Sequence, residues 1–151
     1  MRVFNSVDEL AAATGQPIGT SEWLTITQDA VNLFADATGD HQWIHVDPER
    51  AAGGPFGTTI AHGFLTLALL PRMHHDMFRV DGVKMAVNYG LNKVRFPAPV
   101  PVGARVRGRA GIADVVDLGD GAYQVTLSTT VEVDGAAKPA CVAESIIRYL
   151  T

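Results

Sequence analysis

The segment AHGFLTLALLPRMHHDMF, residues 61–78, decides the fold that we expect. From Phe64 to Leu70 it is apolar on nearly every side, and a helix without a polar face must be covered from several directions. Pro71 should kink or end this helix, because proline lacks a backbone N–H and clashes with the carbonyl one turn back. We therefore expect a central helix that other elements surround.

The sequence after this helix alternates between apolar and polar residues, which is typical of strands. The alternation of Val87, Tyr89 and Leu91 slips in phase before Val94, and this indicates a bulge near Asn92. Further strands are predicted over residues 104–115, 123–133 and 141–150, with turns at 119–121 and 134–135. Helices followed by consecutive strands indicate the α+β class, with a curved antiparallel sheet around the central helix.

Two more helices are predicted before it. Ser6 can cap a short helix over residues 6–13, and Thr25 or Thr27 can cap a stronger one that stops at Gly39. The apolar face of the second helix should consist of Ile26, Ala30, Leu33, Phe34 and Ala37. Residues 40–59 are polar and rich in turn formers, and we expect a long loop there, which in small domains is often functional.

Length and composition exclude several classes of protein. The 151 residues suit one domain over residues 1–151, and a net charge of −4 excludes a nucleic-acid binder built on a basic face. Cys141 is the single cysteine, so an intramolecular disulfide and a cysteine zinc site are both excluded. No stretch is long and apolar enough for a signal peptide or a membrane span. We expect a soluble cytoplasmic protein.

Asp40 and His45 are the first candidates for chemistry. They lie five residues apart in the loop, and a carboxylate and an imidazole at that range can hold one water between them for acid–base work. Such pairs also occur by chance, and a solvated pair is the alternative. His62 and Gly63 open the central helix, where unpaired N–H groups can receive an oxygen that gains negative charge. A glycine needed only for close packing is the alternative there.

Together these stretches resemble the MaoC-like (R)-specific enoyl-CoA hydratases, including the NodN-like branch of that family. The resemblance rests on Gly39-Asp40-x-x-x-x-His45-x-Asp47, on Ile60-Ala61-His62-Gly63 and on KVRFPAPVPVGARVR at residues 93–107. It implies a hot-dog fold and a homodimer with acyl-CoA sites at or near the subunit interface. The implied reaction, in fatty acid metabolism, is reversible syn addition of water to a trans-2-enoyl-CoA, giving an (R)-3-hydroxyacyl-CoA.

The resemblance also assigns roles to residues. It implies that Asp40 and His45 are catalytic and that the Gly63 backbone N–H binds the oxyanion. The substrate is implied to be a thioester of CoA or acyl-carrier protein, with no metal and no cofactor. The family commonly reads Asp-x-Asn-Pro-x-His, whereas this chain has Gln42-Trp43 in the middle, so the larger Trp43 can change how the acyl chain enters. Many members also have a serine in the central helix where this chain has Leu70-Pro71-Arg72.

Several other residues have two interpretations. Candidate substrate-binding residues are Trp43, His62, Asn92 and Arg95; His62 is also expected to make a structural hydrogen bond, and Arg95 fits either a CoA phosphate or a salt bridge. Arg105, Arg107 and Arg109 share one strand face that is either solvated or attracts the CoA nucleotide. For His74-His75-Asp76 we favour a solvated helix end over a metal site. His41 either tunes the pKa of Asp40 or faces water, and Cys141 should be a small buried hydrophobic residue.

Two other functions stay open from the residues alone. A hot-dog acyl-CoA thioesterase would release free thiol and leave the double bond unchanged. A non-catalytic subunit would bind acyl-CoA or acyl-carrier protein without turnover. The Asp40–His45 pair argues against the second, because a binding subunit has no need of a positioned water.

Overall fold

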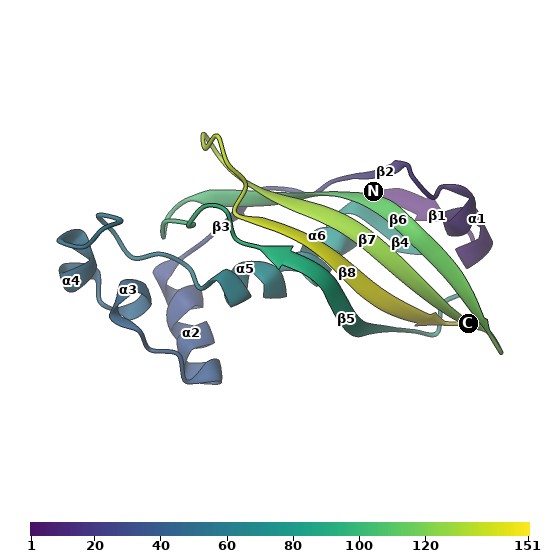
Figure 1. The fold of residues 1–151 in the computed structure, drawn as a ribbon, viewed down its shortest axis with the longest axis horizontal. Helices are drawn as coiled ribbons and strands as arrows, with labels where there is room; N and C mark the ends of the chain where they lie inside the picture. The colour runs from purple at the N-terminus through teal and green to yellow at the C-terminus, as the bar shows by residue number, and fades with distance from the viewer.

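The computed structural model describes residues 1–151, with six helices and eight strands (Figure 1). The helices are α1 Val7–Ala12, α2 Gln28–Thr38, α3 Trp43–Val46, α4 Pro48–Ala52, α5 Gly63–Ala68 and α6 Leu70–Met77. The strands are β1 Arg2–Phe4, β2 Pro17–Thr20, β3 Leu24–Thr25, β4 Phe78–Val80, β5 Met85–Arg95, β6 Arg105–Gly119, β7 Ala122–Val133 and β8 Cys141–Leu150.

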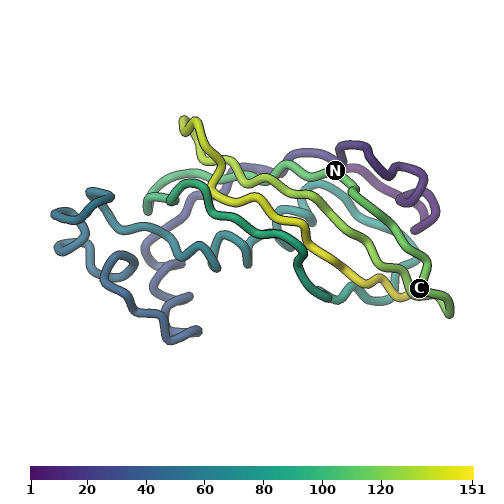
Figure 2. Tube along the Cα trace, in the orientation of Figure 1, coloured from purple at the N-terminus to yellow at the C-terminus, as the bar shows by residue number.

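The four long strands β5 to β8, together with the short strands β2 and β3, form the predicted antiparallel sheet. Its order is β2-β6-β7-β8-β5, with β3 also paired to β6, so β5 is an edge strand. The register of β5 against β8 shifts between Leu91 and Val94, which confirms the predicted bulge. The sheet curves over α5 and α6, while α2, α3 and α4 project beyond one end of it, as the chain trace also shows (Figures 1 and 2). No helix is long and apolar enough to cross a membrane.

The central helix is divided in two, as Pro71 predicts. α5 ends before Leu69, and Pro71 lies in the first turn of α6, where its missing N–H costs no hydrogen bond. Leu65, Leu70 and Met73 are buried against the sheet, but the side chain of Phe64 is 70% exposed. Within one chain, therefore, the helix is covered on the sheet side and open beside Phe64. The second half, α6, ends at Met77.

The predicted apolar face of α2 is partly wrong. Thr27 caps the helix and Gly39 ends it, as expected, but the fully buried residues are Val31 and Ala35, and Leu33 is 69% exposed. The reason is the position of α2 beyond the end of the sheet. Only a narrow row of its side chains can reach the rest of the molecule, and Leu33 lies outside this row.

Residues 40–59 are not the continuous loop that the composition suggests. They contain α3 and α4, and the side chain of Asp47 caps α4 by accepting a hydrogen bond from the Arg50 N–H at 3.0 Å. Helices of four and five residues are too short to show a periodic apolar pattern. The short strands β1, β2, β3 and β4 were missed for the same reason, and β1 pairs with β4 in a separate parallel ribbon.

Candidate active site

Asp40 is placed by the end of α2. Gly39 has a left-handed backbone with φ of 79°, which glycine adopts without a steric penalty, and the chain turns there to bring Asp40 over the start of α5. The Asp40 side chain is 52% exposed. Its Oδ1 lies 3.4 Å from the Gln42 N–H, a long contact that leaves the carboxylate available to a substrate or water.

His45 has a defined proton arrangement. The ring is buried, and its Nδ1 lies 2.7 Å from the carbonyl oxygen of Ile60. A carbonyl oxygen only accepts hydrogen bonds, so Nδ1 carries the proton and donates it. Nε2 then carries the lone pair and has no hydrogen-bond partner within the chain. His45 is therefore arranged as a proton acceptor at Nε2.

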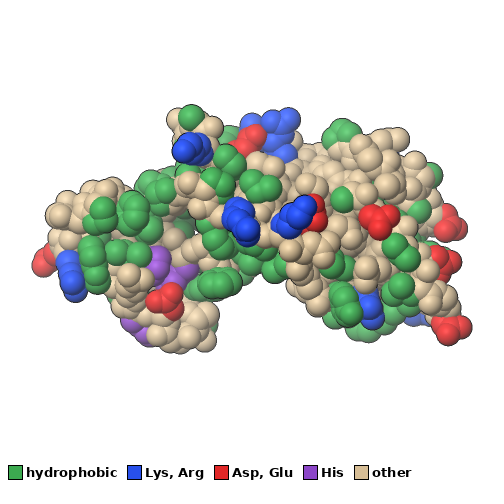
Figure 3. Space-filling model, in the orientation of Figure 1, with side chains coloured by type: hydrophobic (Ala, Val, Ile, Leu, Met, Phe, Trp, Pro, Cys, Tyr) green, Lys and Arg blue, Asp and Glu red, His purple; other side chains and the backbone are tan.

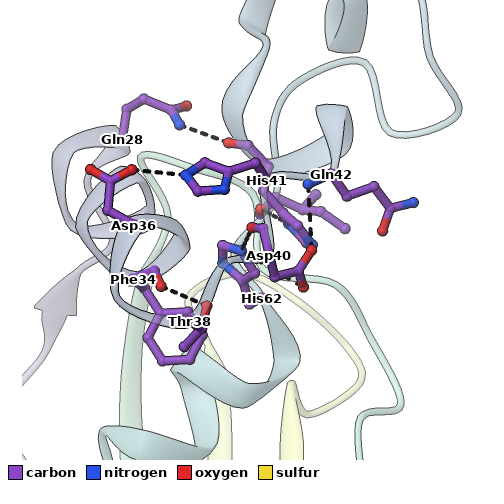
Figure 4. A network of polar contacts seen from close by, with 10 residues as sticks. Gln28, Phe34, Asp36, Thr38, Asp40, His41, Gln42 and His62 are labelled. Carbon is purple, nitrogen blue, oxygen red and sulfur yellow. Dashed lines mark hydrogen bonds and ion pairs between the residues drawn. The ribbon is translucent and has the colours of Figure 1, made fainter.

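His62 joins these two residues. Its Nε2 donates to the backbone oxygen of Asp40 at 2.9 Å and lies 4.0 Å from the Asp40 carboxylate (Figure 4). Its ring stacks on His45, with centroids 3.8 Å apart and planes inclined by 24°, and the other neighbour is Phe34. The expected structural hydrogen bond of His62 is confirmed. Histidine side chains gather where the α2–α4 region meets the rest of the molecule (Figure 3).

Gly63 begins α5 directly after His62. N–H groups in the first turn of a helix have no acceptor within the helix, so the Gly63 N–H is free to bind an oxygen. A Cβ at this position would lie 3.1 Å from the ring of Phe96. The close packing of Phe96 therefore requires a glycine here, which was the alternative interpretation of Gly63 from the sequence. The two roles are compatible, because the N–H of Gly63 remains available.

A hydrogen-bonded bridge holds the α3 backbone in place, and the sequence did not reveal it. Gln28 Nε2 donates to the carbonyl of His45 at 2.7 Å, and the buried Thr59 hydroxyl donates to Gln28 Oε1 at 2.6 Å. Gln28 begins α2, whereas Thr59 lies just before α5. The contacts span 17 and 31 residues, and neither residue belongs to a local motif that could have indicated them.

The remaining candidate binding residues lie around this centre. The Arg50 guanidinium lies over the ring of Trp43, with its Cζ 4.4 Å from the ring centroid, and the same ring packs against Gly54. Asn92 and Arg95 are exposed on β5. Arg95 donates to the carbonyl of Val94 and forms no ion pair, so the salt-bridge interpretation is wrong.

The arginine face on β6 is not a free cationic surface. Arg107 and Arg109 pair with Glu132, and Arg105 pairs with Asp134. Hydrogen bonding from Arg107 is the main reason that the pKa of Glu132 is lowered. The face remains partly solvated, but its charges are matched by acids on and after β7, which argues against attraction of a nucleotide.

The solvated interpretation is wrong for His74. This residue is 5% exposed, because α6 packs against the sheet, and its Nε2 lies 2.9 Å from the Thr129 hydroxyl. His75 is exposed as expected. His41 is also exposed and bonds to Asp36, which raises the pKa of His41. Cys141 is a buried hydrophobic residue as predicted, and burial raises the pKa of its thiol to about 11.

Asp40, His45 and His62 offer potential metal-ligand atoms within 4.8 Å of one another. Their orientation does not suit a metal ion. Stacked rings direct their in-plane nitrogens side by side, whereas a tetrahedral ion needs lone pairs that converge on one point. One nitrogen of each ring is also committed to a backbone carbonyl. The arrangement instead suits a proton-transferring pair, Asp40 and His45, supported by His62.

Comparisons with known proteins show which family and which folds this chain is similar to. Residues 9–135 match the family model of the MaoC like domain. The chain is 73% identical over 150 residues to 3-hydroxyacyl-thioester dehydratase Z of Mycobacterium tuberculosis, covering 99% of both proteins. It is 47% identical to nodulation protein N of Rhizobium leguminosarum, covering 93% of this chain and 89% of that protein. The solved (R)-hydratase from A. caviae is similar with a TM-score of 0.68 at 24% identity, over 89% of this chain and 98% of that one.

Proposed function

The chain belongs to the MaoC-like dehydratase family and has its hot-dog fold, and on that premise we propose that it hydrates trans-2-enoyl thioesters reversibly to (R)-3-hydroxyacyl thioesters. The observation that carries the proposal is the unpartnered Nε2 of His45 beside the accessible carboxylate of Asp40. The activity in the name of the 73% identical relative supports the same chemistry. The carrier is CoA or acyl-carrier protein.

The proton transfers follow from the two side chains. In the hydration direction, water held between Asp40 and His45 attacks C3, and His45 Nε2 takes its proton. The proton passes from His45 to the Asp40 carboxylate, which delivers it to C2, so both groups return to their starting states. Positioned acids and bases of this kind contribute typically 10²–10⁴-fold to a rate. Because both transfers use these two groups, we propose that neither a metal nor an organic cofactor takes part.

The thioester oxygen gains negative charge when the C3–O bond forms. We place this oxygen at the Gly63 N–H, because that donor has no partner in α5 and follows His62 directly in the chain. Trp43, Asn92 and Arg95 remain proposed substrate-binding residues, with Arg95 free of ion pairs and next to Phe96, which covers Gly63. The cytoplasmic location stays a prediction from the sequence.

We also propose that the protein acts as a homodimer joined along β5. This strand has no neighbour on its outer edge, and its main-chain groups there can pair with a second copy. The large apolar side chains of Met85, Val87, Tyr89 and Leu91 on this strand are all between 44% and 56% exposed. A soluble monomer would be expected to protect such an edge.

The activity is tested with crotonyl-CoA, by following the loss of the enoyl absorbance and assigning the chirality of the product. Asp40→Asn and His45→Gln should each lower kcat by about 10²–10⁴-fold. His41→Gln is the matched control, because His41 neighbours Asp40 but bonds to Asp36. Full activity in both site variants would contradict the proposal. Release of free thiol with an unchanged double bond would indicate a thioesterase, and saturable binding without turnover would indicate a binding subunit.

A further inference from the structure

A cavity of about 430 Å³ is lined by residues of α5, α6, β5 and β8, four elements whose arrangement Figure 1 shows. Four of its lining residues, Phe64, Leu67, Pro71 and His74, are spaced three or four apart and so share one face of the helical segment. Among its lining residues, Phe64 is the one that directly follows Gly63, the proposed oxyanion donor, in the chain. Its walls are mainly apolar, as a site for an acyl chain requires.

The helical face sets the reach of the cavity. From Gly63 to His74 the chain advances about three helical turns, on the order of 16 Å. Strands β5 and β8 form the opposite wall. Of their residue pairs, Leu91–Ser145 lies nearer to the end of β5 that precedes Phe96, and Asn88–Ile147 lies further from that end. An acyl chain whose thioester carbonyl is at Gly63 can therefore extend along this face toward His74.

The walls of this cavity contain one buried polar atom without a partner, on Ser145, and one nitrogen of His74 that makes no hydrogen bond within the protein. Ser145 Oγ is buried and has no hydrogen-bond partner. His74 uses Nε2 to contact the Thr129 hydroxyl, and its Nδ1 makes no hydrogen bond within the chain. Desolvation lowers the pKa of His74 to about 4, so the ring is neutral near pH 7, and Nδ1 is either a donor or an acceptor according to its tautomer.

A purely structural role explains only part of this arrangement. The contact between His74 and Thr129 links α6 to β7, but it requires one ring nitrogen and leaves the other unused. Ser145 forms no such link, and alanine would fill its place on β8 at no loss of hydrogen bonding. Polar groups left unpaired in an apolar cavity weaken the binding of a plain alkyl chain, whereas a ligand that pairs with them is favoured.

We propose that His74 and Ser145 are specificity-determining residues that recognise a hydroxyl or carbonyl group carried on the acyl chain, away from the thioester. The enzyme therefore selects oxygenated enoyl or 3-hydroxyacyl thioesters over unsubstituted chains of the same length. This selection rests on the proposed hydratase activity and adds a substrate class to it. Pairing with the substrate oxygen satisfies polar atoms that are otherwise without a partner.

The experiment compares trans-2-enoyl-CoA substrates in matched pairs of increasing length, ending in a methyl or a hydroxyl group. For chains long enough to reach His74, the wild type should favour the hydroxyl substrate by about tenfold in kcat/KM. His74→Leu and Ser145→Ala should each remove most of that preference. His75→Gln is the matched control, since His75 is exposed on the same helix, and it should keep the preference.

The outcomes separate this inference from the activity itself. Failure of the wild type to hydrate crotonyl-CoA would contradict the proposed function, because crotonyl is too short to test the distant polar groups. Crotonyl-CoA turnover with no preference between the matched pairs, or with a preference for methyl, would overturn the specificity proposal. Should His74→Leu not fold, Ser145→Ala decides, and an unchanged preference in that variant overturns the proposal.

Discussion

At the scale of single residues, His62 holds Asp40, the aspartate that we propose as one of the two acid–base groups. It donates to the backbone oxygen of Asp40 and supports the ring of His45 by stacking, so it touches both members of the pair. His62 is buried, and its own Nδ1 has no partner. Because His62 bonds to the backbone of Asp40, we assign it the role of a positioning residue.

His62→Ala should lower kcat by tenfold or more with little change in KM, because small displacements of catalytic groups are costly to the rate. His62→Gln should recover part of kcat, since the glutamine amide can still donate to the Asp40 carbonyl. Steady-state kinetics on crotonyl-CoA measures both, with circular dichroism to compare the folds. Equal losses in the two variants would show that the hydrogen bond is not what His62 contributes.

The sequence revealed these residues unequally. The spacing of Asp40 and His45 in one short motif indicates acid–base chemistry, and His62 lies in a second motif at the start of the central helix. The structure brings all three residues together. Gln28 and Thr59 escaped notice because their contacts join residues far apart in the chain. His74 was misjudged because its burial depends on how α6 packs on β7, and two adjacent histidines contain no information on that packing.

At the scale of elements, the site depends on the junction of α2, α3 and the segment before α5. Gln28 is the link, because it accepts from Thr59 and donates to the backbone of His45. Pro71 correctly predicted the division of the central helix, and the long apolar–polar alternation of residues 123–133 correctly predicted β7. α3 and α4 needed the folded context, because each contains barely more than one helical turn.

Gln28→Glu should destabilise this junction, because a carboxylate replaces the donor and faces the His45 carbonyl. We expect the free energy of unfolding to fall by about 1–3 kcal/mol, together with a lower kcat. Urea unfolding followed by circular dichroism measures the first effect. Asn32→Ala is the control, as Asn32 also accepts from Gln28 but is exposed. Unchanged stability in Gln28→Glu would mean that the bridge contributes nothing to the fold.

At the scale of the whole molecule, the open side of the central helix and the bare edge of the sheet lie together. Phe64 on α5 and Leu91 on β5 both line the same cavity, and both are substantially exposed. Hydrophobic side chains are seen along this part of the surface (Figure 3). The apolar helix predicted a need for cover on several sides, and one chain supplies only part of it. A second copy placed along β5 would supply the rest.

Val87→Lys should therefore give a monomer at concentrations where the wild type is a dimer, because a lysine on an edge strand opposes pairing with another chain. Light scattering after size-exclusion chromatography measures the mass, and crotonyl-CoA hydration measures whether activity falls with it. Val116→Lys is the matched control: Val116 is 40% exposed, close to the 44% of Val87, but lies on β6 near the hairpin turn. It should remain dimeric and active. A wild type that is monomeric at the assay concentration and fully active would contradict the proposed dimer, and the apolar edge of β5 would then need another explanation.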